Sequence, residues 1–539
     1  MPKVIVATPK ISVRLYKSIM RQPREAGLPT SERYANKEAY IDLTPFFGDG
    51  TSISTTKNIG QPCGTFSLSF SDKPNVSGQN MGPVLDRAGL ESIYGLVEPM
   101  DVVEIRMWNG IGPCPNPLPI KMRGFVSEIS RGRQMGKDGK PMRTVVVSGQ
   151  DYGKILQSFQ LLYIPSYDGS APLLTGWNFF EQFGSNVKNV ITGAEFINLL
   201  LDKAINPLLD TLLPQNNGVP RVIKPDLQAS GSVSDSWMNQ EGSVYDLMKQ
   251  YLDVGVWNEL FIEDREDGVY LVWRPVPAID LMTGRAIQNL PQPPKNGTVP
   301  DGYISDIRQT RNDSSVYNYY WVTNNRFAMV DDIYRKVEAI MAGGTQQTME
   351  YPNTAKKYYG VRAMYADSVM SPDDVTSVSS GLEQNPQEQR SGYMLDWIKD
   401  RRDIMIQSNK DNVVLEFGAL SMKGGPTRDN STDALRSGDY LTVLDGKITW
   451  SAYIMSVQDN FIPYNSYSTA MEFARGTGFV ERVSSTGGGV SPWLKEQATR
   501  TDSASLLDRS DVSSVNPALT NAFAWLNEPS AAEKYLKGK

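Results

Sequence analysis

The chain has 539 residues, 40% hydrophobic and 21% charged, which is enough for about three or four domains with cores of their own. It contains no histidine, which excludes Ser-His-Asp triads, Cys-His dyads, HExxH zinc sites and all histidine acid–base chemistry. The net charge of −6 argues against nucleic-acid binding driven by a basic surface, and no apolar run approaches the length of a membrane span.

The N-terminal part of the chain predicts strands. Apolar and small polar residues alternate over 65–70, which is the two-residue period of a half-buried strand, and a similar alternation covers 103–107. Two further strand-like runs, 125–129 and 144–147, flank an Asp-Gly turn signal at 136–140. These two runs predict a long hairpin.

Two helices are predicted next. The first extends from about Thr192 to Leu213; Thr192 and Glu195 have the spacing of a capping box, and Pro207 is expected to kink or divide the helix. The second begins at Ser243, and Asp246 is its expected capping partner. The helical spacing places four apolar residues of this second helix on one face: Val244, Leu247, Met248 and Tyr251.

A hairpin is predicted over 260–273, and a third helix over about 392–407. Residues 288–302 are too rich in Pro and Gly to predict regular structure, and 371–389 is predicted to be a polar surface loop. Residues 484–492 indicate a flexible joint before a C-terminal tail.

The strand pattern near the N-terminus recurs near the C-terminus. The matching segments, in the same order, are 65–70 with 413–420, 99–105 with 437–443, 124–129 with 452–457, and 143–147 with 468–472. Shorter loops on a shared strand order are typical of two copies of one β domain, because loops tolerate changes of length better than strands do. Chance similarity between strand-rich segments is the alternative.

Residues that could carry chemistry are few. The carboxylate pairs that could serve a glycosidase are Asp331 with Asp332, Asp373 with Asp374, and Glu259 with Glu263, and solvated acids are the expected interpretation. Cys63 and Cys114 are expected to be isolated thiols, with a disulfide between them as the alternative. No catalytic, cofactor-binding or metal-binding residue is predicted. A basic hairpin is a candidate subunit contact, with a solvated hairpin as the alternative: Arg131, Arg133, Lys137, Lys140 and Arg143.

Several segments together resemble the hub proteins of contractile-tail baseplates, the group that includes phage late control protein D. The stretches EPMDVVEIRMW, RGFVSEISRG and RTVVVSGQDYGKIL are similar to the first tube-like barrel of that family. Residues 242–277, which include the letters NELF, are similar to its helix and following hairpin, and further likeness lies in KYYGVR, in the helix containing Trp397 and in SGDYLTVLDG. The resemblance covers roughly residues 50–480.

The resemblance implies an α+β, mainly β protein in which two tail-tube-like β-barrels bracket helix-containing middle domains, followed by an extended C-terminal tail. The expected divisions are a first barrel at 1–165, an insert domain at 166–287, a linker with strands and a helix at 288–408, a second barrel at 409–484, and a partner-binding tail at 485–539. The expected docking residues of the tail are its apolar ones: Leu494, Leu506, Leu507, Phe523, Trp525 and Leu526.

The resemblance also implies a structural role rather than catalysis. Three subunits with two barrels each would make a ring of six that joins a sixfold tail tube to a threefold spike. The implied partners are two further copies of the chain, tail-tube and tube-initiator proteins, the central spike and other baseplate wedge proteins, with DNA passing through the lumen and no cofactor. The expected location is the virion, after assembly in the host cytoplasm. Two alternatives stay open: a peptidoglycan hydrolase that uses a carboxylate pair, and a receptor- or carbohydrate-binding tail protein.

Overall fold

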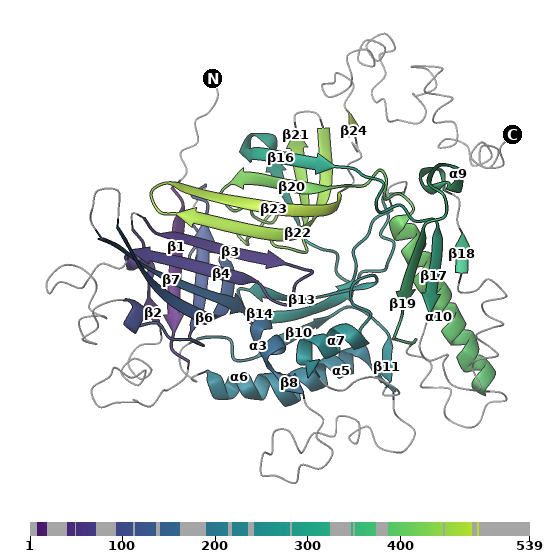
Figure 1. The fold of residues 1–539 in the computed structure, drawn as a ribbon, viewed down its shortest axis with the longest axis horizontal. Coiled ribbons are helices and arrows are strands. Elements are labelled where there is room, and N and C mark those ends of the chain that lie inside the picture. Colours follow the sequence, from purple (N-terminus) through teal and green to yellow (C-terminus); the bar gives the residue numbers. More distant parts are fainter. Residues whose placement is uncertain are drawn as a thin grey trace, which may run out of the picture.

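The computed structural model describes residues 8–18, 40–48, 50–71, 93–111, 114–135, 141–161, 190–213, 218–234, 242–280, 283–323, 346–348, 351–372, 386–445, 448–476 and 482–483. Within these ranges strands predominate over helices, so the predicted α+β, mainly β fold class is confirmed. The largest element is a 14-stranded sheet, and the helices and smaller sheets lie beside it (Figure 1).

The 14-stranded sheet contains two copies of one strand arrangement. Repeat 1 consists of β1 (Lys10–Tyr16), β3 (Ser52–Asn58), β4 (Thr65–Ser71), β5 (Val102–Trp108), β6 (Ile120–Met135) and β7 (Pro141–Asp151). Repeat 2 consists of β15 (Asn296–Pro300), β16 (Ile304–Thr310), β20 (Glu416–Lys423), β21 (Tyr440–Asp445), β22 (Ile448–Ile462) and β23 (Ser466–Gly476). Neighbouring strands follow the order β3-β4-β7-β6-β5-β1 in repeat 1 and β16-β20-β23-β22-β21-β15 in repeat 2. The predicted recurrence of the strand order is therefore confirmed, although β15 runs parallel to β21 whereas β1 runs antiparallel to β5.

Strand irregularities recur at matching positions in the two repeats. The register of β6 against β7 shifts between Val126 and Glu128, and the register of β22 against β23 shifts between Ile454 and Ser456. A bulge bends the strand that carries it and increases its local twist. The two long strands are therefore bent at the same place, and the bulges fix which residues of the repeats are equivalent.

The turn that leads into β5 also recurs before β21. Met100 and Gly438 have positive φ angles of 74° and 89°, a conformation that favours glycine. In each repeat the next residue, Asp101 or Asp439, uses its side chain to accept a hydrogen bond from the backbone N–H three positions earlier. The second copy keeps a glycine at the strained position, whereas the first copy holds a methionine there.

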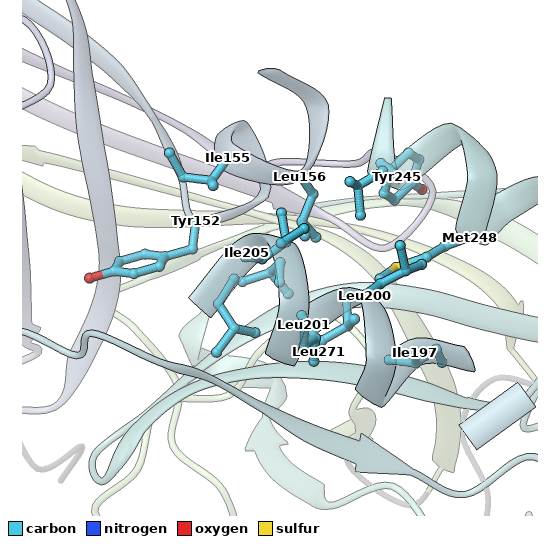
Figure 2. Packing of buried hydrophobic residues seen from close by; sticks show 14 of the residues in the cluster. Tyr152, Ile155, Leu156, Ile197, Leu200, Leu201, Ile205, Tyr245, Met248 and Leu271 are labelled. Atoms are coloured by element: carbon cyan, nitrogen blue, oxygen red, sulfur yellow. The ribbon is translucent and has the colours of Figure 1, made fainter. Parts of the chain in front are cut away.

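Between the repeats in sequence lies a helical layer, formed by α3 (Gly153–Ser158), α5 (Gly193–Leu200), α6 (Asn206–Leu212) and α7 (Val244–Tyr251). The predicted Thr192–Glu195 capping box is present, and Pro207 lies in the first turn of α6, after a π-helical segment at Leu201–Ile205 that divides the predicted helix. Figure 2 shows apolar side chains of these helices meeting Leu271 of the strand β14 (Gly268–Pro275).

The predicted hairpin is formed by β13 (Asn258–Arg265) and β14, and β10 (Ile223–Leu227) extends it in parallel. A second small unit places α10 (Pro386–Asn409) beside β17 (Tyr319–Thr323), which pairs with β18 (Gln346–Thr348) and β19 (Ala363–Asp367). The remaining described strands and α-helix are β2 (Ile41–Asp42), β8 (Gln160–Leu161), β9 (Val190–Thr192), β11 (Ser232–Ser234), β12 (Gly242–Ser243), α9 (Lys356–Tyr359) and β24 (Arg482–Val483), and short 3-10 turns lie at Thr44–Phe46, Ile93–Gly95, Asp301–Tyr303 and Pro352–Thr354.

Two loop predictions were wrong. Residues 296–300, in the Pro- and Gly-rich segment, form β15 and pair in parallel with β21. Gly297 is needed there because a Cβ would lie 2.7 Å from the Leu435 side chain, so this glycine permits close packing rather than disrupting the strand. Residues 386–389 form the first turn of α10 instead of a loop, since proline is well tolerated at the start of a helix.

Candidate functional site at the junction of the two repeats

The two repeats meet edge to edge through β3 and β22. Six residue pairs, from Ile53 with Phe461 to Asn58 with Ser456, form an antiparallel ladder between them. Just past the ladder, the Ile59 amide donates to the Met455 carbonyl over 3.0 Å. Phe461 and Tyr467 of repeat 2 lie in the hydrophobic core of repeat 1. The junction is therefore continuous in both hydrogen bonding and packing.

The β13–β14 hairpin packs against this junction and carries charged side chains into it. The side chain of Lys57 on β3 is 13% exposed there, with its Nζ 2.6 Å from Asp264 Oδ2 on the hairpin and 3.1 Å from Asp151 Oδ2 at the end of β7. Burial by itself would lower the pKa of Lys57, but the two carboxylates outweigh it and raise that pKa above its ordinary value. Lys57 therefore stays charged and joins repeat 1 to the hairpin.

A second cluster joins the hairpin to repeat 2. The Glu263 carboxylate on β13 accepts hydrogen bonds from Arg428 Nη2 at 2.8 Å, Arg436 Nη1 at 3.0 Å and Arg265 Nε at 2.8 Å. Burial alone would raise the pKa of Glu263, but the three guanidinium groups reverse this and lower it well below the ordinary value. Arg428 also bonds Asp439 in the recurring turn.

A third cluster contains the other carboxylate of the predicted pair. The Tyr453 hydroxyl donates to Glu259 Oε2 over 2.7 Å, and Arg274 Nε donates to the same oxygen over 3.2 Å. Arg274 Nη2 also donates to the Gly438 carbonyl over 2.6 Å. Burial raises the pKa of the Tyr453 hydroxyl well above its ordinary value, so it acts as a donor at all physiological pH values.

The tip of the hairpin is bound to repeat 1. Arg123 Nη1 donates to the Arg265 carbonyl over 2.7 Å, and Arg106 Nη1 donates to Glu266 Oε2 over 2.7 Å. Glu104 on β5 accepts hydrogen bonds from both Arg106 and Arg123. The hairpin consequently holds both repeats at once, and its charges serve to fix their relative orientation.

This arrangement does not provide the groups of a glycosidase. A general acid needs a raised pKa, whereas the pKa of Glu263 is lowered, and Glu259 is held by a tyrosine and an arginine. The other predicted carboxylate pairs lie outside the described residues: Asp331, Asp332, Asp373 and Asp374. Across the described ranges, no group of three or more His, Cys, Asp or Glu residues is placed to hold a metal ion. None of the described helices is both long and apolar enough to cross a membrane.

The other predicted site residues that the structure describes lie outside these ionic clusters. Arg131 and Arg133 lie on the exposed end of β6, and Arg143 lies opposite Arg133 on β7, which confirms the predicted hairpin pairing. Lys137 and Lys140 lie outside the described residues, as do all the docking residues proposed for the tail: Leu494, Leu506, Leu507, Phe523, Trp525 and Leu526. Cys63 is buried, Cys114 is exposed and both are free thiols, as expected.

The ionic clusters of the junction were not predicted. One signal was available: β13 places Glu259 and Glu263 on the same face, on either side of Phe261, in a strand that is almost entirely buried. Their partners could not be found in this way, because Lys57 and Asp264 are 207 positions apart in sequence.

A scan against protein families and a comparison with curated proteins give no match. Among solved structures, the chain is similar to a tail protein from Neisseria meningitidis, with 11% identity over 88% of this chain and 99% of that one and a TM-score of 0.44. It is also similar to a 43 kDa tail protein of prophage MuSo2 from Shewanella oneidensis, with 10% identity over 87% and 97% of the two chains and a TM-score of 0.43. A third similar structure is an E. coli type VI secretion component described as similar to the T4 tail proteins gp27 and gp5, with 8% identity over 79% and 73% and a TM-score of 0.35.

Proposed function

We propose that the chain is a structural subunit of a contractile-tail baseplate hub. Three copies form a ring of six repeats that joins a sixfold tail tube to a threefold central spike. The observation that supports this is the duplication, in which two sheets of the same strand order pair edge to edge within one chain. A threefold ring of such chains presents six similar faces on one side and threefold symmetry elsewhere.

The junction supports a role based on geometry rather than turnover. The hairpin ties both repeats with buried ion pairs centred on Lys57, Glu259 and Glu263, so the angle between the repeats is held fixed. A ring that must match a tube of fixed symmetry needs such a fixed angle. Because these carboxylates are held in ion pairs, the structure offers no support for the glycan-hydrolase alternative.

Further partners belong to the same proposal. The ring contacts tube and tube-initiator proteins on one side, the spike on the other and wedge proteins at its periphery, within the tail of a virion assembled in the host cytoplasm. The segment 485–539 docks onto one of these neighbours through its apolar residues. Neither partner recognition nor this docking needs a cofactor.

One face of the sheet is suited to line a channel for DNA. Directly opposed residues share a face of a sheet, and one such row across five strands contains only hydroxyl and amide side chains. This row is Ser468, Asn460, Ser54, Ser67 and Ser148, and the next opposed residues on either side are the exposed Lys423 of β20 and Glu128 of β6. The neighbouring row on the other face is buried and apolar: Tyr467, Phe461, Ile53, Leu68 and Val147. A row that is uncharged except at its two ends gives phosphates few sites at which to bind tightly.

The channel assignment can be tested by adding charge to this face. The native protein should not retain DNA at physiological salt, whereas the variant Gln458→Lys/Asn460→Lys should bind DNA with an affinity that falls as salt rises. Tyr464→Lys is the control, because Tyr464 is 93% exposed in the turn between β22 and β23 and away from this row. DNA binding by the native protein, or equal binding by the control, would contradict the assignment.

The ring itself is tested by mass. Native mass spectrometry of the purified full chain should give three times the 59.9 kDa chain mass, and addition of a spike protein should give a complex of three chains with one threefold spike. A chain that stays monomeric at high concentration and ignores the spike would refute the proposed function.

A further inference from the structure

The strand registers define which residues of the two repeats are equivalent. With the bulges aligned, Ile129 of β6 corresponds to Val457 of β22. From Ile129 the pairing runs through Val147 and Leu68 to Ile53 on β3. From Val457 it runs through Met471 and Leu420 to Ile307 on β16. Thus β16 is the counterpart of β3, and the sequence Thr-Arg-Asn at 310–312 matches Thr-Lys-Asn at 56–58.

The edge of β22 that pairs with β3 has its counterpart on β6, where the described residues include no strand paired to that edge. In repeat 2, residues 456–461 of β22 pair with β3. The corresponding residues of β6 are 128–133, and within the described ranges they pair only with β7, because β5 pairs with β6 no further than Phe125. Within the same ranges β16 pairs only with β20 and forms the end of the sheet. Among the described residues, these two strand edges therefore have no neighbouring strand, and they are the counterparts of the two edges that meet in the junction.

Side chains on the two unpaired edges are more exposed than their counterparts on the paired edges, as expected where a neighbouring strand is missing. Ile53 is fully buried, whereas its counterpart Ile307 is 39% exposed. Val457 is buried and its counterpart Ile129 is only half-buried. Residues 130–135 of β6 are all exposed, as are 305–309 of β16. Long exposed edges with free backbone groups are templates for pairing with another strand.

We propose that β6 of one copy of the chain pairs with β16 of a second copy, antiparallel and in the register of the β22–β3 junction. This interface deepens the proposed function and rests on it, because it names the contact that closes the ring. The predicted opposed pairs are Glu128 with Asn312, Ile129 with Arg311, Ser130 with Thr310, Arg131 with Gln309, Gly132 with Arg308, and Arg133 with Ile307.

The proposed pairing has two consequences. Each copy offers one edge and receives another, so the contact is head-to-tail and produces a closed ring when its rotation closes. Gly132 lies opposite Arg308, where a residue without a side chain leaves room for a long one. Arg131 and Arg133, the described residues of β6 in the predicted contact hairpin, then lie within the subunit interface.

Disulfide trapping tests the register. Opposed residues in an antiparallel ladder have Cα atoms about 4.5–5.5 Å apart, within the range that a disulfide spans. In the full chain carrying Cys114→Ser, we would combine Ser130→Cys with Thr310→Cys and oxidise mildly. Gln458→Cys with Thr56→Cys is the matched positive control, because these residues are the equivalent pair inside one chain. Ser130→Cys with Gln309→Cys is the negative control, since Gln309 lies on the other face of the strand.

The expected result is a reducible covalent trimer for the Ser130–Thr310 pair, an intrachain bond for the positive control and no linkage for the negative one. A chain that is trimeric by mass, bridges the positive control and leaves the Ser130–Thr310 pair unlinked would overturn the proposed interface and leave the proposed hub intact. A chain that is monomeric by mass would overturn both. Linkage of the Gln309 pair in place of the Thr310 pair would also overturn the register.

Discussion

The Glu263→Gln substitution tests whether the ionic clusters hold the repeats together. The side chain of Glu263 is 10% exposed and accepts hydrogen bonds from three guanidinium groups within 3.0 Å. Glutamine removes the charge and turns an amide N–H₂ toward the arginines. Arg428 keeps its pair with Asp439 and Arg265 its pair with Asp226, but Arg436, whose side chain is 10% exposed, loses its pair with Glu263. Leaving a buried charge without its partner costs about 3–5 kcal/mol. We expect a loss of this size in the free energy of unfolding of the unit that contains the junction.

The measurement is urea unfolding followed by tryptophan fluorescence, because Trp273 on β14 and Trp450 on β22 are buried on the two sides of the junction. With a urea dependence of about 3 kcal/mol per molar, the transition midpoint should fall by about 1 M or more. Asp267→Asn is the matched control: it replaces a carboxylate by the corresponding amide on the same hairpin, but the ion pair of Asp267 with Lys224 is exposed and screened by water, so its loss should change stability far less. Equal effects of the two substitutions would refute the reasoning.

The difference in stability between the native protein and Glu263→Gln depends on pH in a defined way. The pKa of Glu263 is lowered on folding from an ordinary value of 4.5, so the unfolded chain takes up a proton at this residue before the folded protein does. The stability that Glu263 provides is therefore fully present above pH 4.5 and is lost as the pH falls below that value. The difference in unfolding free energy between the native protein and Glu263→Gln should be constant near neutral pH and shrink in acid. A difference that grows in acid would contradict the assignment.

Three further predictions concern the turn, the lysine and the thiols. Gly438→Ala should destabilise repeat 2 by about 1–3 kcal/mol in thermal or urea unfolding, because φ is 89° and a Cβ would lie 2.9 Å from Arg274 Nη2; Gly302→Ala, where a Cβ meets nothing within 4 Å, should change little. Lys57→Met leaves two buried carboxylates without a cation and should cost about 3–5 kcal/mol by the same measurement, and an unchanged midpoint would show that the lysine is dispensable. Burial raises the pKa of Cys63 to about 11, so iodoacetamide at pH 8 should label only Cys114 in the native protein and both thiols in urea; rapid native labelling of both would contradict the burial.

The elements with strong local signals were predicted from sequence. The Thr192–Glu195 capping box, the cap at Ser243 and the β13–β14 hairpin depend on residues close together in the chain, and all three are present. The four recurring strands were also located, because apolar alternation survives where individual residues change. Two of the four were aligned out of register: the structure matches 65–70 with 417–422 rather than 413–420, and Val147 with Met471 rather than Glu472. The segment 296–300 was missed because its glycine and proline indicate a loop until the packing partner Leu435 is known.

Contacts between distant parts of the chain could not be predicted from local patterns. Lys57 meets Asp264, and Glu263 meets Arg428, only because the fold brings a central hairpin under both repeats. The correspondence of β3 with β16 was likewise hidden, since only Thr and Asn and one basic residue are shared at 56–58 and 310–312. The correspondence follows from the strand registers, which are known only from the structure.

The central claim is that three chains arrange six equivalent repeats in a ring. The most direct test is an electron microscopy reconstruction of the purified full-length oligomer with no symmetry imposed. We expect a threefold ring of six similar sheets, with a strand contact between chains that matches the β22–β3 contact within a chain. A ring with another number of chains, or one whose chains meet through other elements, would contradict it.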